Sequence, residues 1–280
     1  MADDSTMMIE SDNDIIEIRT ASDCSVILCV DDTTIGLETA NTIIEILTRT
    51  LLANKPDWLC EYIPSYTSLM IEFSLYDIDH LGVNAFLRQL VSDLRTQLTN
   101  FLAEKPSAPK RIDFEHNSDK NHNVKVPLSP SKRIHRIPVC YALSAAETDL
   151  SKIAQEKKMS EELIITSHSE NTYRVYATGF MPGFAYLGEL PEALSQPRLS
   201  KPRLKVPKGA VAIADRQTAI YPDESPGGWH IIGYTPLDLL FKASDKVGSE
   251  HGDIEALLKT GDYVEFYPIT ESEYHGWASS

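Results

Sequence analysis

Paired cysteines and long apolar runs are both missing from this sequence. None of its cysteines, Cys24, Cys29, Cys60 and Cys140, shows CxxC spacing. This excludes a zinc ribbon and a thioredoxin-type redox pair, and we expect reduced thiols that pack as small apolar side chains. No apolar stretch approaches the roughly 18 residues that a membrane-spanning helix requires. We therefore expect no membrane partner.

Positive charge is scarce as well. The 280 residues include 26 Lys and Arg against 41 Asp and Glu, which gives a formal net charge of -15. A chain with this balance repels the phosphates of nucleic acid, so nucleic acid is not an expected partner. No Lys or Arg precedes Arg19, whereas a secretory signal begins with a basic segment. We expect a cytoplasmic protein.

The common short catalytic motifs are absent. The sequence has no GxxxxGK[ST] phosphate loop, no GxGxxG after a strand, no HExxH and no GxSxG. Any ATP chemistry must therefore be unconventional or shared with another chain. His116, His122 and His135 match no metal-ligand spacing, so we expect no metal site.

The length predicts two domains, and the pattern changes near residue 141. Residues 1–13 are acidic and polar, and we expect a disordered leader. Residues 14–141 are predicted to form a hairpin and a helix, then two strands and a second helix, which is an α+β and ferredoxin-like order. A basic, proline-containing segment at 105–135 is expected to be a flexible loop, and 136–141 a strand that completes this sheet.

Residues 142–280 are predicted to be mainly β. Two short helices are expected at 149–157 and 160–166. Beyond them, short apolar runs are separated by Pro and Gly clusters, which is typical of a β-barrel or sandwich. These runs are Tyr173 to Ala177, Ala210 to Ala214, Ala219 to Tyr221, His230 to Ile232 and Tyr263 to Tyr267.

A Pro-Gly pair lies between two aromatic residues near the start of this region. Pro182 and Gly183 suit a type II turn, because Pro fixes φ and Gly permits a positive φ. The turn would hold Phe180 and Phe184 as rigid walls of a binding site. The alternative is a hairpin turn whose rings plug into the core.

A second glycine cluster follows Ser225, in the order Pro226, Gly227, Gly228, Trp229. Consecutive glycines allow backbone N–H groups to converge on a carboxylate, phosphate or oxyanion. The alternative is a plain loop with a packing tryptophan.

Cations gather before and within the next predicted strand. Alternation would direct Lys201, Arg203 and Lys205 to one side, and Leu204 and Val206 to the other. Such a row suits an anionic ligand, although it could also be a solvated face.

A histidine directly follows the second short helix. His168 is a candidate general base near neutral pH, with a structural role as the alternative.

Two long segments carry a family resemblance. They read TGFMPGFAYLGELP from Thr178 and PRLSKPRLKVPKGAVAIADRQTAIYPDESPGGWHIIGYTPLDLLF from Pro197 to Phe241. They resemble the family that contains KipI, PxpB of the 5-oxoprolinases and the first component of allophanate hydrolase. The resemblance implies a ferredoxin-like α+β domain followed by a cyclophilin-like β-barrel. It also implies pairing with a homologous KipA or PxpC-type barrel and with a third, PxpA-type subunit.

The activity implied by the resemblance is cleavage of 5-oxo-L-proline to L-glutamate, with ATP and Mg²⁺ as the co-substrate of the complex. The implied catalytic residues are His168, Arg203 and Gln217. The implied substrate-binding or anion-binding residues are Phe180, Pro182, Gly183, Phe184, Lys201, Lys205, Tyr221, Pro226, Gly227, Gly228 and Trp229.

The sequence departs from the family pattern at three places. Residues 142–147 replace a segment rich in glycine and acids, Asp215 and Arg216 stand where small residues are common, and Tyr234 stands where arginine is common. These departures leave a urea or allophanate-like substrate open. The alternative functions are a KipI-like inhibitor of a sensor histidine kinase and a carboxyltransferase or allophanate hydrolase-type subunit.

Overall fold

The structure, a computed structural model, describes residues 15–103, 133–142, 148–242 and 254–277. The leader predicted at 1–13 lies outside these residues, as does nearly all of the loop predicted at 105–135. The chain divides into two compact units, residues 1–132 and residues 133–280. No helix within the described part of the chain has the length and apolar character needed to cross a bilayer.

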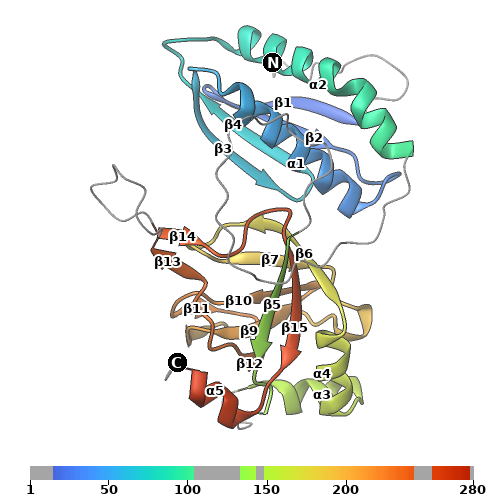
Figure 1. Ribbon diagram of the computed structural model, residues 1–280, viewed down its shortest axis with the longest axis vertical. Coiled ribbons are helices and arrows are strands. Elements are labelled where there is room, and N and C mark those ends of the chain that lie inside the picture. Colours follow the sequence, from blue (N-terminus) through green and yellow to red (C-terminus); the bar gives the residue numbers. More distant parts are fainter. Residues whose placement is uncertain (1–14, 104–132, 143–147, 243–253, 278–280) are drawn as a thin grey trace, which may run out of the picture. The chain divides into compact units, whose positions relative to one another are not determined.

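Unit 1 is built from two hairpins, each followed by a helix. In chain order its described elements are β1 (Ile16–Ser22), β2 (Ser25–Val30), α1 (Leu37–Asn54), β3 (Leu59–Ser65), β4 (Ser68–Phe73) and α2 (His80–Ala103). Neighbouring strands run antiparallel in the order β1-β2-β4-β3 (Figure 1). This part of the sequence prediction is confirmed as α+β.

The two helices of unit 1 each bury one apolar stripe. In α1, Ile43, Ile44 and Leu47 are essentially inaccessible to solvent, and in α2 Val83 and Leu87 are equally buried. Spacings of three and four residues place such side chains on one face of a helix. Both stripes and the inner face of the sheet form a single apolar core.

The strand predicted at residues 136–141 is not part of the unit 1 sheet, in which β1 takes the place beside β2. Strand β4 lies between β2 and β3, which α1 connects, and β1 pairs with the free side of β2. The prediction that 136–141 completes this sheet is therefore wrong. That segment is β5 (Ile134–Val139), which pairs in parallel with β15 (Tyr263–Pro268) of unit 2.

Unit 2 is mainly β, as predicted from its short apolar runs. Its other described elements are α3 (Leu150–Lys157), α4 (Glu161–Ser169), β6 (Thr172–Thr178), β7 (Ala185–Gly188), the 3₁₀ helix η1 (Glu192–Leu194), β8 (Arg203–Val206), β9 (Ala210–Ala214), β10 (Gln217–Ile220), β11 (Ser225–Gly227), β12 (His230–Tyr234), β13 (Leu240–Lys242), β14 (Ile254–Ala256) and α5 (Glu271–Trp277).

The main sheet strands of unit 2 follow the order β5-β15-β6-β7-β10-β9-β12 (Figure 1). The two ends of this order meet, because Cys140 after β5 forms an antiparallel bridge with Tyr234 at the end of β12. Two separate short pairs, β8 with β11 and β13 with β14, lie off this path.

Alternation along β9 sends side chains to two different clusters. Val211 and Ile213 belong to the main apolar core of unit 2. Ala210, Ala212 and Ala214 point to the opposite face, where they meet aromatic side chains of the neighbouring elements. The small side chains on this face leave room for the aromatic rings. The candidate site lies around these rings.

Candidate functional site

The Pro-Gly turn has the predicted geometry. Phe184 donates its backbone N–H to the carbonyl of Met181 at 3.1 Å, and Gly183 has a φ of 78°. A Cβ on Gly183 would lie 2.7 Å from Leu240, so both the turn and the packing require glycine here.

The two rings that flank this turn have different environments. Phe184 is 2% exposed, whereas Phe180 is 63% exposed. They meet edge to face with centroids 5.3 Å apart. Phe184 thus plugs into the core, as the alternative interpretation predicted, and Phe180 is available at the surface.

Phe184 is the centre of an aromatic cluster on the alanine face of β9. Its ring makes edge-to-face contacts with Tyr186 at 5.0 Å, Tyr221 at 5.4 Å and Trp229 at 6.0 Å. Burial raises the pKa of the Tyr221 hydroxyl above its usual value of about 10. The predicted residues Phe184, Tyr221 and Trp229 are therefore brought together, but as a packed wall.

The two glycines before Trp229 differ in the space that a side chain would have. A Cβ on Gly227 would lie 2.4 Å from the Tyr221 hydroxyl oxygen, so packing excludes a side chain there. A Cβ on Gly228 would meet nothing closer than Pro202, at 3.7 Å. Neither the N–H of Gly228 nor that of Trp229 donates a hydrogen bond within the described residues.

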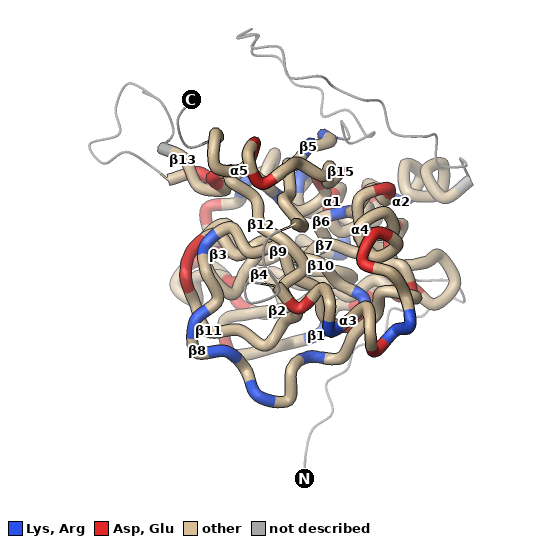
Figure 2. The backbone as a smooth tube through the Cα atoms, turned by 90° about the horizontal axis from the view of Figure 1, so that it is seen from below, with Lys and Arg blue, Asp and Glu red and all other residues tan. Residues whose placement is uncertain are grey.

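Residues 195–203, which we name the strap, run alongside this loop. Leu199 donates its N–H to the carbonyl of Gly228 at 2.7 Å, and His230 Nε2 lies 2.9 Å from the carbonyl oxygen of Pro197. The guanidinium of Arg198 lies 5.9 Å from the centre of the Trp229 ring. The strap therefore places cations beside residues 226–229, which we name the glycine loop. Figure 2 shows Lys and Arg in blue at and around β8.

The three cations that were predicted to lie on one side differ in their ion pairs. Arg203 pairs with Asp149 and Lys205 pairs with Glu224, at 2.6 Å and 2.8 Å. Lys201 forms no ion pair with any described residue. On the opposite side of the alternation, Val206 is buried while Leu204 is 88% exposed. The reason is that only the end of β8 reaches the core.

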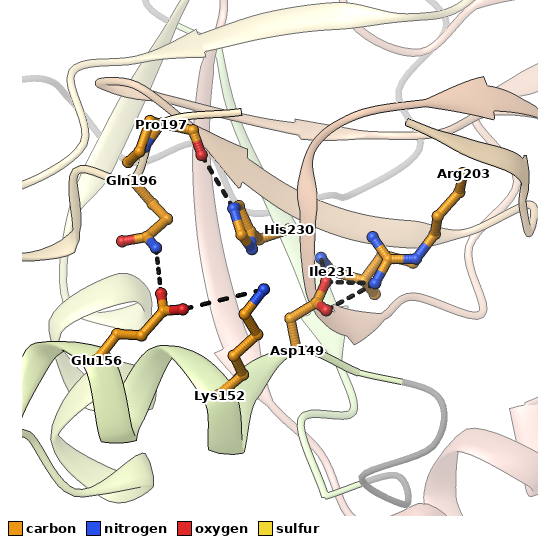
Figure 3. A network of polar contacts seen from close by, with 8 residues as sticks. All are labelled: Asp149, Lys152, Glu156, Gln196, Pro197, Arg203, His230 and Ile231. Carbon is orange, nitrogen blue, oxygen red and sulfur yellow. Dashed lines mark hydrogen bonds and ion pairs between the residues drawn. The ribbon is translucent and has the colours of Figure 1, made fainter. Parts of the chain in front are cut away.

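Arg203 is held by several contacts that the sequence did not reveal (Figure 3). Its Nη2 donates to both carboxylate oxygens of Asp149, at 2.6 Å and 2.8 Å. Its Nη1 donates to the carbonyl of Trp229 at 3.2 Å. Asp149 in turn accepts the N–H of Ile231 at 2.8 Å. This contact network connects α3, β8 and β12.

The other end of α3 holds the beginning of the strap. Glu156 accepts a hydrogen bond from the side-chain amide of Gln196 at 2.6 Å and lies 3.9 Å from Lys152 (Figure 3). Lys157 donates to the carbonyl of Ser195. The helix predicted at 149–157 thus has a function that periodicity alone does not indicate.

His168 lies in the core of unit 2, away from the cluster just described. It is fully buried, with Nδ1 at 2.7 Å from the Tyr141 hydroxyl and Nε2 at 2.9 Å from Thr218 Oγ1. Its ring stacks on Phe266 with centroids 4.6 Å apart. Burial lowers the pKa of His168 to about 3. This environment favours the structural alternative for His168 over the general base.

Gln217 stands at the start of β10, opposite Ala214 in the hairpin with β9. The turn between these strands contains Asp215, whose φ is 50°. The carboxylate of Asp215 lies 3.8 Å from Arg198 Nε. Gln217 is half-buried. The turn that precedes it carries the ion pair between Asp215 and Arg198.

Two residues of this region escaped sequence reasoning. Asp149 and His230 take their places from contacts with residues far away in the chain. For Asp149 a signal existed, because an aspartate directly before a helix is a common N-cap. Its side chain caps nothing here and binds Arg203 instead.

A family model described as "Carboxyltransferase domain, subdomain C and D" matches residues 16–247. The B subunit of the Bacillus subtilis 5-oxoprolinase is 34% identical over 220 residues, which cover 78% of this chain and 78% of that protein. The B subunit of the Escherichia coli O157:H7 5-oxoprolinase is 43% identical over 144 residues, 51% of this chain and 62% of that protein.

Solved structures agree with these matches. The crystal structure of TTHA0988 superimposes with a TM-score of 0.60 at 29% identity, over 84% of this chain and 38% of that chain. The Kluyveromyces lactis urea amidolyase superimposes with a TM-score of 0.60 at 19% identity, over 93% of this chain and 15% of that chain. The latter likeness concerns the fold alone.

The match to the family model runs through both units and includes the Pro-Gly turn, the strap and the glycine loop. The chain therefore belongs to the family of the carboxyltransferase domain, subdomains C and D.

Proposed function

We propose that this chain is the PxpB-type component of an ATP-dependent 5-oxoprolinase, which opens the lactam of 5-oxo-L-proline to give L-glutamate. The observation that carries the proposal is the identity of 34% to the corresponding Bacillus subtilis protein along most of both chains. On this proposal the active enzyme needs a homologous KipA or PxpC-type subunit and a third, PxpA-type subunit.

The fold class we propose is a ferredoxin-like unit followed by a cyclophilin-like barrel. The strand order β1-β2-β4-β3 supports the first, with the edge strand coming from the N-terminal hairpin. The bridge between Cys140 and Tyr234, which joins the ends of the strand order in unit 2, supports the second.

The substrate is an anion, and we place its carboxylate near the glycine loop. Three features support this site: the N–H groups of Gly228 and Trp229, the guanidinium of Arg203, and the ammonium of Lys201, which forms no ion pair with a described residue. Backbone N–H groups next to glycine form concave anion sites, and a nearby arginine strengthens them. Phe180 at the turn supplies an exposed apolar surface for the ring of the substrate.

ATP with Mg²⁺ would activate the lactam: the lactam oxygen would take the γ-phosphoryl group while ADP leaves, and water would then attack the activated carbon, break the C–N bond and release phosphate. Among the described residues there is no group of three or more His, Cys, Asp or Glu side chains that could hold a metal ion. On this proposal Mg²⁺ enters with the nucleotide.

The test is 5-oxoproline-dependent ATP hydrolysis by the chain alone, with its KipA-type partner, and with the third subunit added. Activity only in the full mixture is the expected result. A full mixture that hydrolyses no ATP in response to 5-oxoproline would overturn the proposal, and urea or allophanate in the same assay would then test the carboxyltransferase or allophanate alternative.

A further inference from the structure

Asp149 makes several polar contacts that the sequence did not predict. Its side chain is 11% exposed and accepts hydrogen bonds from Arg203 Nη2 and from the backbone N–H of Ile231. Its own N–H donates to the carbonyl of Ile231 at 2.6 Å. One residue therefore fixes both a cationic side chain and the backbone of β12 (Figure 3).

These contacts leave part of the Arg203 guanidinium available. The group has five N–H donors, and the described residues accept hydrogen bonds from Nη1 and Nη2 only. The Nε–H and one N–H of Nη1 have no acceptor among them, and the side chain is 31% exposed. Arg203 can therefore bind a ligand while it is held by Asp149 and the Trp229 carbonyl.

We propose that Asp149 is a positioning residue for the anion site. It holds the guanidinium of Arg203 against the carbonyl of Trp229, so that the cation and the N–H groups of Gly228 and Trp229 keep one rigid arrangement for a ligand carboxylate. The use of 5-oxoproline as the ligand rests on the proposed function, whereas the seat for the guanidinium does not.

Two possible roles for Asp149 predict opposite changes in substrate affinity when its carboxylate is removed. If Asp149 acts only as a counter-charge, its removal leaves the positive charge of the guanidinium uncompensated, and a substrate carboxylate binds more tightly. If Asp149 positions Arg203, its removal frees a long side chain whose ordering must then be supplied by the substrate, and binding weakens.

The first experiment uses the reconstituted complex with Asp149→Asn. Asparagine keeps an acceptor for the Ile231 N–H but loses the charged partner of Arg203. We expect the KM for 5-oxoproline to rise about tenfold, the usual scale for one charge-assisted hydrogen bond, with a smaller change in kcat. The matched control is Asp238→Asn, which makes the same chemical change in the exposed ion pair with Lys208. A KM for Asp149→Asn that is unchanged or lower would overturn the proposal.

The second experiment needs no catalysis and therefore separates this inference from the proposed function. Methylguanidinium is added to the isolated Arg203→Ala chain and to the isolated Asp149→Asn/Arg203→Ala chain during thermal unfolding. We expect methylguanidinium to raise the unfolding midpoint of the single variant but not of the double variant. An equal response of both chains, or no response of either, would show that Asp149 does not form a guanidinium seat. A wild-type complex without activity would count against the proposed function alone.

Discussion

Cys140 and Tyr234 exchange both of their backbone hydrogen bonds, at 2.8 Å and 3.0 Å, and so join the end of β5 to the end of β12. Gly233 makes this approach possible. A Cβ at Gly233 would lie 2.8 Å from the carbonyl oxygen of Cys140 and 2.8 Å from Val139. The bridge between the two ends of the strand order thus depends on the absence of a single methyl group.

Replacing Gly233 with alanine should loosen this bridge. We expect Gly233→Ala to lower the free energy of unfolding by about 2 kcal/mol, because the added methyl group overpacks a well-filled site. Urea denaturation measures the change. Gly276→Ala is the control, since a Cβ there meets nothing within 4 Å. Equal stability of the two variants would contradict this view of the bridge.

The two glycines before Trp229 should respond differently to alanine. Gly227→Ala places a methyl group 2.4 Å from the Tyr221 hydroxyl, and we expect it to lower the free energy of unfolding by about 2 kcal/mol.

Gly228→Ala should fold normally, because the new methyl group would sit 3.7 Å from Pro202. We expect it to reduce kcat/KM for 5-oxoproline about tenfold, since it fills the space beside two backbone donors that a ligand uses. Urea denaturation together with the ATP hydrolysis assay separates the two effects. Full activity of Gly228→Ala would exclude these donors from the site.

His168 should make the stability of the protein depend on pH. Its pKa in the fold is about 3, whereas an unfolded chain has a histidine pKa near 6.5. Between these values the unfolded state binds the proton, so the stabilising contribution is complete above about pH 6.5 and is lost as the pH falls. From pH 7 to pH 5 this histidine should cost about 2 kcal/mol of unfolding free energy.

His168→Gln provides the test, because glutamine can still hydrogen-bond with Tyr141 and Thr218 but does not titrate. We expect a flatter dependence of stability on pH, measured by urea denaturation, and retained 5-oxoproline-dependent ATP hydrolysis. Identical pH profiles for the two proteins would rule out the linkage. A complete loss of activity in folded His168→Gln would restore the catalytic role implied by the family resemblance.

Asp215 occupies a backbone conformation that favours glycine. Its φ of 50° costs a non-glycine residue about 1 kcal/mol, so Asp215→Gly should stabilise the chain by a similar amount. Arg216→Gly is the matched control in the same turn. Its φ is not among the positive ones, so glycine there should destabilise through backbone entropy. Thermal unfolding of both variants measures the difference, and a destabilised Asp215→Gly would mean that the ion pair with Arg198 outweighs the strain.

Local chemistry predicted the Pro-Gly turn well. The positive φ of Gly183 follows from the Pro-Gly pair. Apolar periodicity likewise located α1 and α2, and the short apolar runs located β6, β9, β10, β12 and β15. These features depend on residues that are close in the chain, so a single sequence carries the information.

Pairing between distant segments was predicted poorly. The strand at Ile134–Val139 was placed in the wrong sheet, because its composition suits either one. The partner strand β15 comes more than 100 residues later in the sequence, and no local pattern indicates which strand it will pair with. Strand pairing is decided by the topology of the whole unit.

The sequence by itself determined which residues could do chemistry: the glycine loop, the cations Lys201, Arg203 and Lys205, and a histidine. Only the tertiary structure decided how each of them is used. Arg203 meets Asp149, and His168 is enclosed by Tyr141, Thr218 and Phe266. The physical reason is that the partners and the burial of a charged or titratable group come from segments far away in the chain, and these set its orientation and its pKa.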